Sequence, residues 1–229
     1  MRGVRLCEAR PNMAADKLNY ILAAVCMLGA FTCVFAEWRA RKMLRIASKV
    51  VASTAFVAIA AANGALDSNY GRLILTALVL SWFGDVMLLS LRISMLLGGI
   101  AAFFLAHIAF AGAFFTMPID VMWFLIGLLS MTAVAAVLLR WLWPYLRSIY
   151  RFAVPAYLAA IVMMTSLAIG AGSDRGSMLL VVGAVVFAAS DISVARDRFV
   201  ERSIVNKAWG LPLYYAAQIM FAMSVLSRG

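Results

Sequence analysis

The fold is decided by two stretches: residues 71–91 read GRLILTALVLSWFGDVMLLSL, and residues 177–195 read SMLLVVGAVVFAASDISVA. Each is long enough to cross the hydrocarbon core of a bilayer, for which about 17–25 apolar residues suffice. Each also carries one aspartate near its end, Asp85 in the first and Asp191 in the second. A carboxylate facing lipid costs roughly 2.5–3.5 kcal/mol, so we expect both acids to face the inside of a helix bundle.

The composition excludes a soluble globular protein. Of the 229 residues, 66% are hydrophobic and 13% are charged, whereas soluble domains hold about 45–50% apolar and about 25% charged residues. A folded core of this length cannot bury so much apolar surface, so the bilayer must be the solvent. The net charge of +10 is typical of nucleic-acid-binding proteins. Here, however, the basic residues lie in short connections that orient helices, and we expect no nucleic-acid partner.

Apolar segments of the same kind fill the rest of the chain. We predict an all-α, polytopic membrane bundle of eight transmembrane helices. It forms a single domain, residues 19–229, after an N-terminal tail, residues 1–18, and its possible repeats are residues 19–118 and 121–229. The predicted spans are residues 19–36, 49–66, 71–91, 93–116, 121–142, 152–170, 177–195 and 211–226.

Lysines and arginines are distributed unevenly between the connections. The odd-numbered connections carry thirteen of them, and the even-numbered connections carry only Arg72 and Arg175. Because cytoplasmic loops are enriched in Lys and Arg, we expect the odd connections in the cytoplasm and both termini outside. In a bacterium the membrane would be the plasma (inner) membrane. The basic N-terminal tail opposes this orientation, and a start at Met13 rather than Met1 would remove most of its charge.

The two halves of the chain resemble each other at an offset of 106 residues. This offset places Asp85 on Asp191, and five further residues of offset place residues 103–111 on residues 214–222. The alternative is that apolar sequences align by accident. If the repeat is real, each half holds an even number of spans, so the halves are parallel. The two acids then lie side by side at equal depth.

Polar residues gather near the cytoplasmic ends of the predicted spans. Asp85 precedes Arg92 by seven residues and Asp191 precedes Arg196 by five, which puts both acids ~7–10 Å inside the boundary at 1.5 Å per residue. A lone histidine on an apolar span is more often a hydrogen-bonded core residue. We take six polar side chains as candidates for binding a substrate: Lys49, His107, Ser190, Tyr214, Tyr215 and Gln218.

Two buried carboxyl groups in close contact cannot both ionise easily. One then remains a proton donor beside a proton acceptor, which is the equipment for acid-catalysed hydrolysis. The alternative is a structural pair of interhelical hydrogen bonds. Motifs for a serine triad, a phosphate-binding loop or a dinucleotide site do not occur. The single histidine, His107, excludes a His-rich metal site, whereas a metal site built from carboxylates stays open without support.

Together these residues resemble the YhhN/transmembrane-86 family of lysoplasmalogenases, over nearly all eight spans. The family often has Lys-Pro where this chain reads Lys49-Val50. The landmarks are Ser48-Lys49, Phe83-Gly84-Asp85 with Leu88, Phe103 to His107, Phe187-Ala188-Ala189-Ser190-Asp191 with Ala195, and Tyr214-Tyr215 with Gln218.

The resemblance implies hydrolysis of the alkenyl (vinyl) ether bond of lysoplasmalogens to a fatty aldehyde and a glycerophospho-ethanolamine or -choline. It places the two family acids on Asp85 and Asp191. One acid protonates the β-carbon of the vinyl ether, and the other, ionised, stabilises the oxocarbenium ion and activates water. The implied partners are a lysophospholipid substrate and membrane lipids, and no cofactor is needed.

Two other classes of function stay open. A proton-coupled transporter of lipids or small molecules also uses buried acids and parallel repeats, but it needs a path through both leaflets. A non-enzymatic lipid-binding membrane protein would keep its function when either aspartate is replaced.

Overall fold

The computed structural model describes residues 13–90, 92–172 and 178–226. All regular secondary structure in this part of the chain is helical. The described residues do not include residues 1–12, with Met1, or Arg175. The predictions that rest on them, the charge of the sixth connection and the choice of start codon, therefore stay predictions.

Eight α-helices occur in these ranges, one for each predicted apolar segment. Two short helical turns, η1 (Trp143–Tyr145) and η2 (Arg196–Val200), extend the ends of the fifth and seventh. The helices are α1 (Met13–Trp38), α2 (Lys42–Ala62), α3 (Asn69–Met87), α4 (Ile93–Phe115), α5 (Val121–Leu142), α6 (Tyr150–Ala171), α7 (Met178–Ala195) and α8 (Ile204–Ser224).

Several helices begin earlier than the apolar segments do. α1 begins at Met13 rather than at residue 19, α2 at Lys42 rather than at residue 49, and α8 at Ile204 rather than at residue 211. Backbone hydrogen bonds and caps decide where a helix begins, and hydropathy does not. The hydroxyl of Ser203, for example, accepts a hydrogen bond from the first turn of α8. Lys49 therefore lies within α2 and does not open it.

α2 also ends earlier than predicted: the helix ends at Ala62, whereas the predicted span ended at residue 66. Gly64 adopts φ +76°, a left-handed conformation that favours glycine and is common just after helix ends. The next helix then starts at a cap, because the Ser68 hydroxyl accepts a hydrogen bond from the Gly71 amide at 3.0 Å.

Seven helices, α1 to α7, are long and apolar enough to cross a membrane. The count found in the described chain is therefore seven candidate spans, where the sequence predicted eight. α8 has 21 residues, but polar side chains such as Asn206, Lys207 and Gln218 lower its mean hydropathy. The chain thus has the architecture of a polytopic membrane protein.

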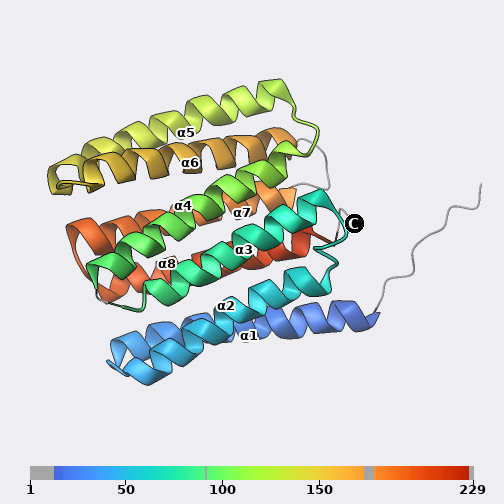
Figure 1. Cartoon of the computed structure of the whole chain (residues 1–229), viewed down its shortest axis with the longest axis horizontal. Coiled ribbons are helices and arrows are strands. Elements are labelled where there is room, and N and C mark those ends of the chain that lie inside the picture. The colour runs from blue at the N-terminus through green and yellow to red at the C-terminus, as the bar shows by residue number, and fades with distance from the viewer. Residues whose placement is uncertain (1–12, 91, 173–177, 227–229) are drawn as a thin grey trace, which may run out of the picture.

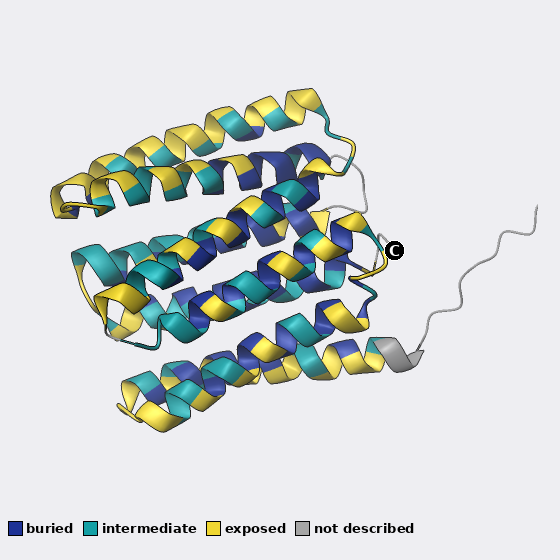
Figure 2. Ribbon diagram, viewed as in Figure 1, coloured by how far each residue is buried: buried dark blue, intermediate teal, exposed yellow. Residues whose placement is uncertain are grey.

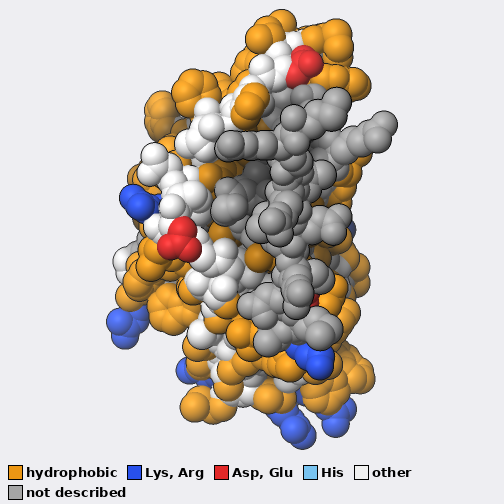
Figure 3. Space-filling model, turned by 90° about the vertical axis from the view of Figure 1, so that its right-hand side faces the viewer, with side chains coloured by type: hydrophobic (Ala, Val, Ile, Leu, Met, Phe, Trp, Pro, Cys, Tyr) orange, Lys and Arg blue, Asp and Glu red, His pale blue; other side chains and the backbone are white. Residues whose placement is uncertain are grey.

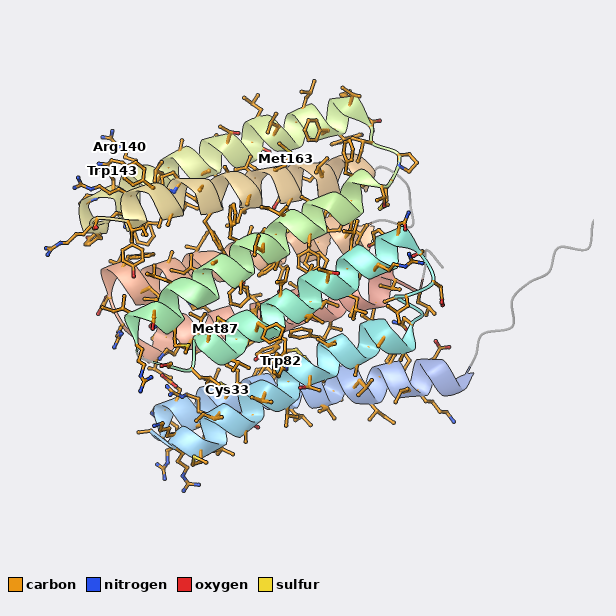
Figure 4. All side chains as sticks on the ribbon, viewed as in Figure 1. Cys33, Trp82, Met87, Arg140, Trp143 and Met163 are labelled. Carbon is orange, nitrogen blue, oxygen red and sulfur yellow. The ribbon has the colours of Figure 1, made fainter. Side chains whose placement is uncertain are left out.

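The helices pack as antiparallel hairpins (Figure 1). α1 pairs with α2 and α5 with α6, and the two hairpins flank a central group of α3, α4, α7 and α8. Beyond its hairpin, α2 packs against α3 and α8, whereas α6 packs against α7 and α4. All odd-numbered connections lie at one end of the bundle, on the left of Figure 1, where Figure 4 also shows Arg140 and Trp143.

The outer faces of the bundle suit lipid. Buried residues line the interior, while α5 exposes nearly its whole length and buries only Gly127 and Leu142 (Figure 2). In the view from the end of the even-numbered connections, hydrophobic side chains form most of the outline of the molecule (Figure 3). The core therefore lies between the hairpins, where the two aspartates are.

Small residues let the helices that carry the aspartates approach their neighbours. A Cβ atom on Gly84 would lie 2.6 Å from the Phe103 ring, so glycine allows α4 to pack on the turn that holds Asp85. Gly210 likewise leaves room for Ser193, whose hydroxyl donates to the Asn206 carbonyl at 2.6 Å. Close contacts of this kind are typical of membrane helices.

Candidate active site

A cavity of about 490 Å³ lies among all eight helices, and both Asp85 and Asp191 line it. Its walls are mostly apolar side chains, many of them from α5 and α6. The lining stops at Phe103 on α4, at Val162 on α6 and at Tyr214 on α8. The cavity therefore occupies the half of the bundle next to the odd-numbered connections.

Asp85, on α3, is surrounded by hydrogen-bond donors. Its Oδ2 accepts hydrogen bonds from the Ser53 hydroxyl at 2.6 Å and from the Tyr214 hydroxyl at 2.8 Å. Its Oδ1 lies 3.0 Å from the Lys49 ammonium. The residue is only 2% exposed. A cation and two hydroxyl donors at these distances stabilise the ionised form of a carboxylate.

A second layer holds these donors in place. The Tyr215 hydroxyl lies 3.2 Å from the Ser53 hydroxyl and donates to the Lys49 carbonyl at 3.4 Å. The Phe56 ring packs against the rings of Tyr214 and Tyr215, with centroids 6.3 and 6.2 Å apart. The side chains of α2 and α8 are thus fixed around Asp85.

Asp191, on α7, has a different set of neighbours. Its Oδ2 accepts a long hydrogen bond from the Tyr157 hydroxyl at 3.4 Å and lies 3.2 Å from His107 Nε2. The latter pair has the distance of an ion pair, but the alignment falls short of a hydrogen bond. The imidazole is fixed by Phe187, which stacks on it at 4.5 Å, and by the Phe103 carbonyl, 2.8 Å from Nδ1.

The position of His107 determines where a proton must be. A carbonyl oxygen only accepts hydrogen bonds, so Nδ1 carries the hydrogen in its contact with Phe103. In a neutral imidazole Nε2 would then present a lone pair to the carboxylate of Asp191, and the two would repel each other. His107 Nε2 is thus the ring atom that faces the carboxyl group of Asp191.

The two aspartates share the cavity but have separate partners. α2 and α8 supply the groups around Asp85, and α6 and α4 supply those around Asp191. No hydrogen bond joins the two carboxyl groups within the described ranges. Any chemistry that uses both would therefore act through a molecule in the cavity.

The structure brings most of the residues predicted from the sequence to this region, at different depths. Ser190 lines the cavity, but its hydroxyl donates to the Phe187 carbonyl at 2.8 Å. Gln218 is fully buried, and its amide has no hydrogen-bond partner among the described residues. The cavity wall includes Lys49, Asp85, Ser190, Asp191 and Tyr214, whereas His107, Tyr215 and Gln218 are not part of it.

Two residues at the site were missed. Ser53 follows Lys49 by four residues, and that spacing puts both on one face of a helix. The spacing could therefore have indicated that Ser53 lies at the site beside Lys49. Tyr157 is a hydroxyl in an otherwise apolar segment, but nothing in its spacing relates it to Asp191. Within the part of the chain that the structure describes, no three His, Cys, Asp or Glu side chains are grouped to hold a metal.

Comparison with known proteins finds a family and several similar proteins. The model of the YhhN family matches residues 44–225. Lysoplasmalogenase TMEM86A of Bos taurus is 28% identical over 159 residues, which cover 67% of this chain and 65% of that protein. Lysoplasmalogenases of Mycobacterium bovis and Mycobacterium tuberculosis are each 31% identical over 192 residues, 80% of this chain and 71% of theirs. No solved structure matches.

Proposed function

The chain belongs to the YhhN family, and from this premise we propose that it is a membrane hydrolase that cleaves the alkenyl ether bond of lysoplasmalogens. The observation that carries the proposal is the cavity, in which two aspartates with opposite surroundings meet apolar walls. A substrate with one hydrocarbon tail and a polar head suits such a space. The names of the relatives support the same reaction.

The surroundings support a division of labour between the two acids. Asp85 lies beside an ammonium group and two hydroxyl donors, which suits the ionised partner. Asp191 lies beside His107 and has no lysine or arginine partner among the described residues, which suits the partner that donates a proton. Asp191 is also the more accessible of the two, with 14% of its side chain exposed against 4% for Asp85. We therefore assign Asp191, with His107 behind it, as the proton donor.

The reaction then proceeds in three steps. Asp191 gives its proton to the β-carbon of the vinyl ether, and the double-bond electrons form the new C–H bond, leaving an oxocarbenium ion. The carboxylate of Asp85 stabilises that cation. Water adds to the α-carbon and releases one proton, which restores the acid. The hemiacetal breaks its bond to the glycerol oxygen, and the hydroxyl proton moves to that oxygen, giving the aldehyde and the glycerophospho-alcohol.

The packing supports two further parts of the proposal, eight spans and a parallel repeat. α2 and α8 lie around Asp85, and α6 and α4 lie around Asp191. In the proposed repeat α2 corresponds to α6 and α8 corresponds to α4, so the two acids have corresponding helices as neighbours, as two parallel halves would give. The contact of α1 with α8 has no comparable counterpart between α5 and α4. α8 packs against α1, α2 and α7, so we propose that it crosses the bilayer with them. The odd-numbered connections are then cytoplasmic, and if the protein is bacterial the membrane is the plasma (inner) membrane.

The location of the cavity favours hydrolysis over transport. A transporter needs an opening toward each leaflet in turn, and the lining residues all lie in the half of the bundle next to the odd-numbered connections. A substrate that enters and leaves within one leaflet fits this geometry.

The test is aldehyde release by the purified protein in lipid nanodiscs. A 1-alkenyl lysophospholipid should give fatty aldehyde, and the matched 1-alkyl ether should give none because it has no double bond to protonate. A protein that releases no aldehyde from the alkenyl lipid, yet binds it, would overturn the proposal in favour of a lipid-binding role.

A further inference from the structure

The cavity is charged at its end near the odd-numbered connections. Four basic and two acidic side chains line this end, an excess of two positive charges. None of them belongs to the acid–base machinery around the two aspartates. The basic side chains are Arg45, Arg198, Arg202 and Lys207, and the acidic ones are Glu37 and Asp197.

Two of the arginines converge on the end of α3. Arg45 Nη2 donates to the Leu89 carbonyl at 3.5 Å, and Arg198 Nη2 donates to the Leu88 carbonyl at 3.4 Å. The carbonyl end of a helix attracts cations, so both guanidinium groups are held here without a substrate. Arg198 reaches this position from the wide turn η2 and Arg45 from α2. They therefore lie about one helical turn beyond Asp85.

The acidic residues leave much of this positive charge free. Glu37 is occupied by Arg45, at 3.1 Å, and by Lys207. Among the described residues, no carboxylate oxygen lies within ion-pair distance of Arg198. Arg45 Nε is buried and has no hydrogen-bond partner there. Within this part of the chain, Arg198 thus lines the cavity with its charge unpaired, and Arg45, which shares Glu37 with Lys207, has one donor without a partner.

Building on the proposed function, we propose that Arg45 and Arg198 bind the phosphate of the substrate head group. In a lysophospholipid, three glycerol carbons and two oxygens separate the vinyl carbon from the phosphorus, and a chain of six bonds is long enough to cover one helical turn, ~5.4 Å. That is the displacement along α3 from Asp85 to Leu88 and Leu89. An ether bond at Asp85 therefore places the phosphate at the two arginines.

Arginine suits this role for a chemical reason. Its planar guanidinium presents paired N–H donors that match two phosphate oxygens, whereas lysine offers a point charge. Phosphate binding by Arg45 and Arg198 would hold the head group at one end of the cavity. The alkenyl chain would then extend along the apolar walls of α5 and α6, with the ether bond between the two aspartates.

The test measures binding rather than turnover, so it stands apart from the fate of the proposed reaction. The probes are a 1-alkyl lysophosphoethanolamine, which cannot be hydrolysed by this route, and the 1-alkylglycerol of the same tail without phosphate. Arg198→Gln should weaken binding of the first by about tenfold or more, the effect of losing one charge-assisted hydrogen bond, and leave the second unchanged. Arg198→Lys should lie between Arg198→Gln and the wild type.

The control is Arg140→Gln, which removes a charge at the same end of the bundle but outside the cavity lining. It should bind both probes like the wild type. Equal weakening of both probes by Arg198→Gln would overturn the proposal, as would full retention of the phospholipid probe. Inorganic phosphate separates the two sources of phosphate: if it displaces the lipid probe at micromolar concentration, the site serves free phosphate rather than a head group.

Discussion

Asp85 accepts hydrogen bonds from Ser53 and Tyr214 and pairs with the Lys49 ammonium. Around Asp191 the nearest groups are a tyrosine hydroxyl at 3.4 Å and an imidazole at 3.2 Å. The two acids lie at corresponding positions of α3 and α7, 106 residues apart. Corresponding positions of the backbone therefore have different neighbours, and it is this difference on which the proposed roles of the two acids rest.

The proposed repeat indicates how the difference arises. At the offset of 106 residues Lys49 corresponds to Pro155 and Ser53 to Ala159. Neither of these can donate a side-chain hydrogen bond, so the second half lacks the cation and the hydroxyl that hold Asp85. Tyr157 and His107 approach Asp191 instead. Two similar helix arrangements thus give the two aspartates different side-chain partners.

The largest expected effect is the loss of catalysis on replacing either acid. Asp191→Asn removes the transferable proton, and Asp85→Asn removes the anion opposite the oxocarbenium ion. Each should lower kcat for vinyl-ether hydrolysis by about 10²–10⁴-fold. The double variant should be little worse than the single variants, because the groups act as a unit. Aldehyde release in nanodiscs measures this, and near-normal turnover of either variant would remove that residue from the mechanism.

The thermal stability of the two Asp→Asn variants should differ even though both lose activity. Asp85→Asn leaves the Lys49 ammonium buried without its counter-ion, and breaking a buried ion pair costs roughly 3–5 kcal/mol. Asp191→Asn replaces a carboxyl group whose neighbours, Tyr157 and His107, do not include a buried lysine or arginine. The thermal midpoint in detergent should therefore fall much further for Asp85→Asn. Adding Lys49→Met to that variant should restore it, and failure to do so would mean that the ion pair is not what stabilises this site.

Much of the fold could be predicted because the bilayer imposes it. A spanning helix needs a long apolar segment, and the eight segments of the sequence each became a helix. Hydropathy did not predict the residues at which the helices end, because those depend on local backbone geometry, such as the left-handed conformation of Gly64 after α2. Hydropathy alone does not identify α8 as a span, because it carries polar side chains that line the site, Lys207 and Tyr214 among them.

Pairings across the bundle could not be predicted in the same way. Periodicity places a residue on a face of its own helix, but it does not say which helix lies opposite. The sequence therefore identified Asp85, Asp191, Lys49 and Tyr214 without their partners. It also suggested that His107 packs like Gln218, its counterpart in the repeat. In the structure His107 lies beside Asp191, whereas Gln218 has no described hydrogen-bond partner.

His107→Gln sharpens this part of the comparison. The repeat alone predicts retained activity, because Gln218 occupies the equivalent position. The geometry predicts a loss of about 10²-fold, since an amide can pack and donate a hydrogen bond but cannot exchange a proton with Asp191. Gln218→Met, at the equivalent position of α8, is the matched control and should keep most of the activity. Equal effects of the two substitutions would mean that His107 serves only in packing.

The smallest expected effect concerns Ser190, which precedes Asp191 as Gly84 precedes Asp85. The sequence made it a candidate for binding the substrate, and it does line the cavity. Its hydroxyl, however, already donates to the Phe187 carbonyl at 2.8 Å within the same helix. Such a bond back along a helix contributes little to stability, and it occupies the only hydrogen that the hydroxyl has.

Ser190→Ala should therefore change kcat and KM by less than about twofold, because the substrate loses no donor and a small side chain still fits the position. A bulkier substitution, Ser190→Leu, tests whether added volume at this position obstructs the cavity. It would extend into the cavity beside Asp191 and should raise KM for long-tailed substrates without affecting the proton transfer itself. A large fall in kcat for Ser190→Ala would show that its hydroxyl turns toward the substrate during catalysis, and Asp191 would then have a third partner that the resting arrangement does not contain.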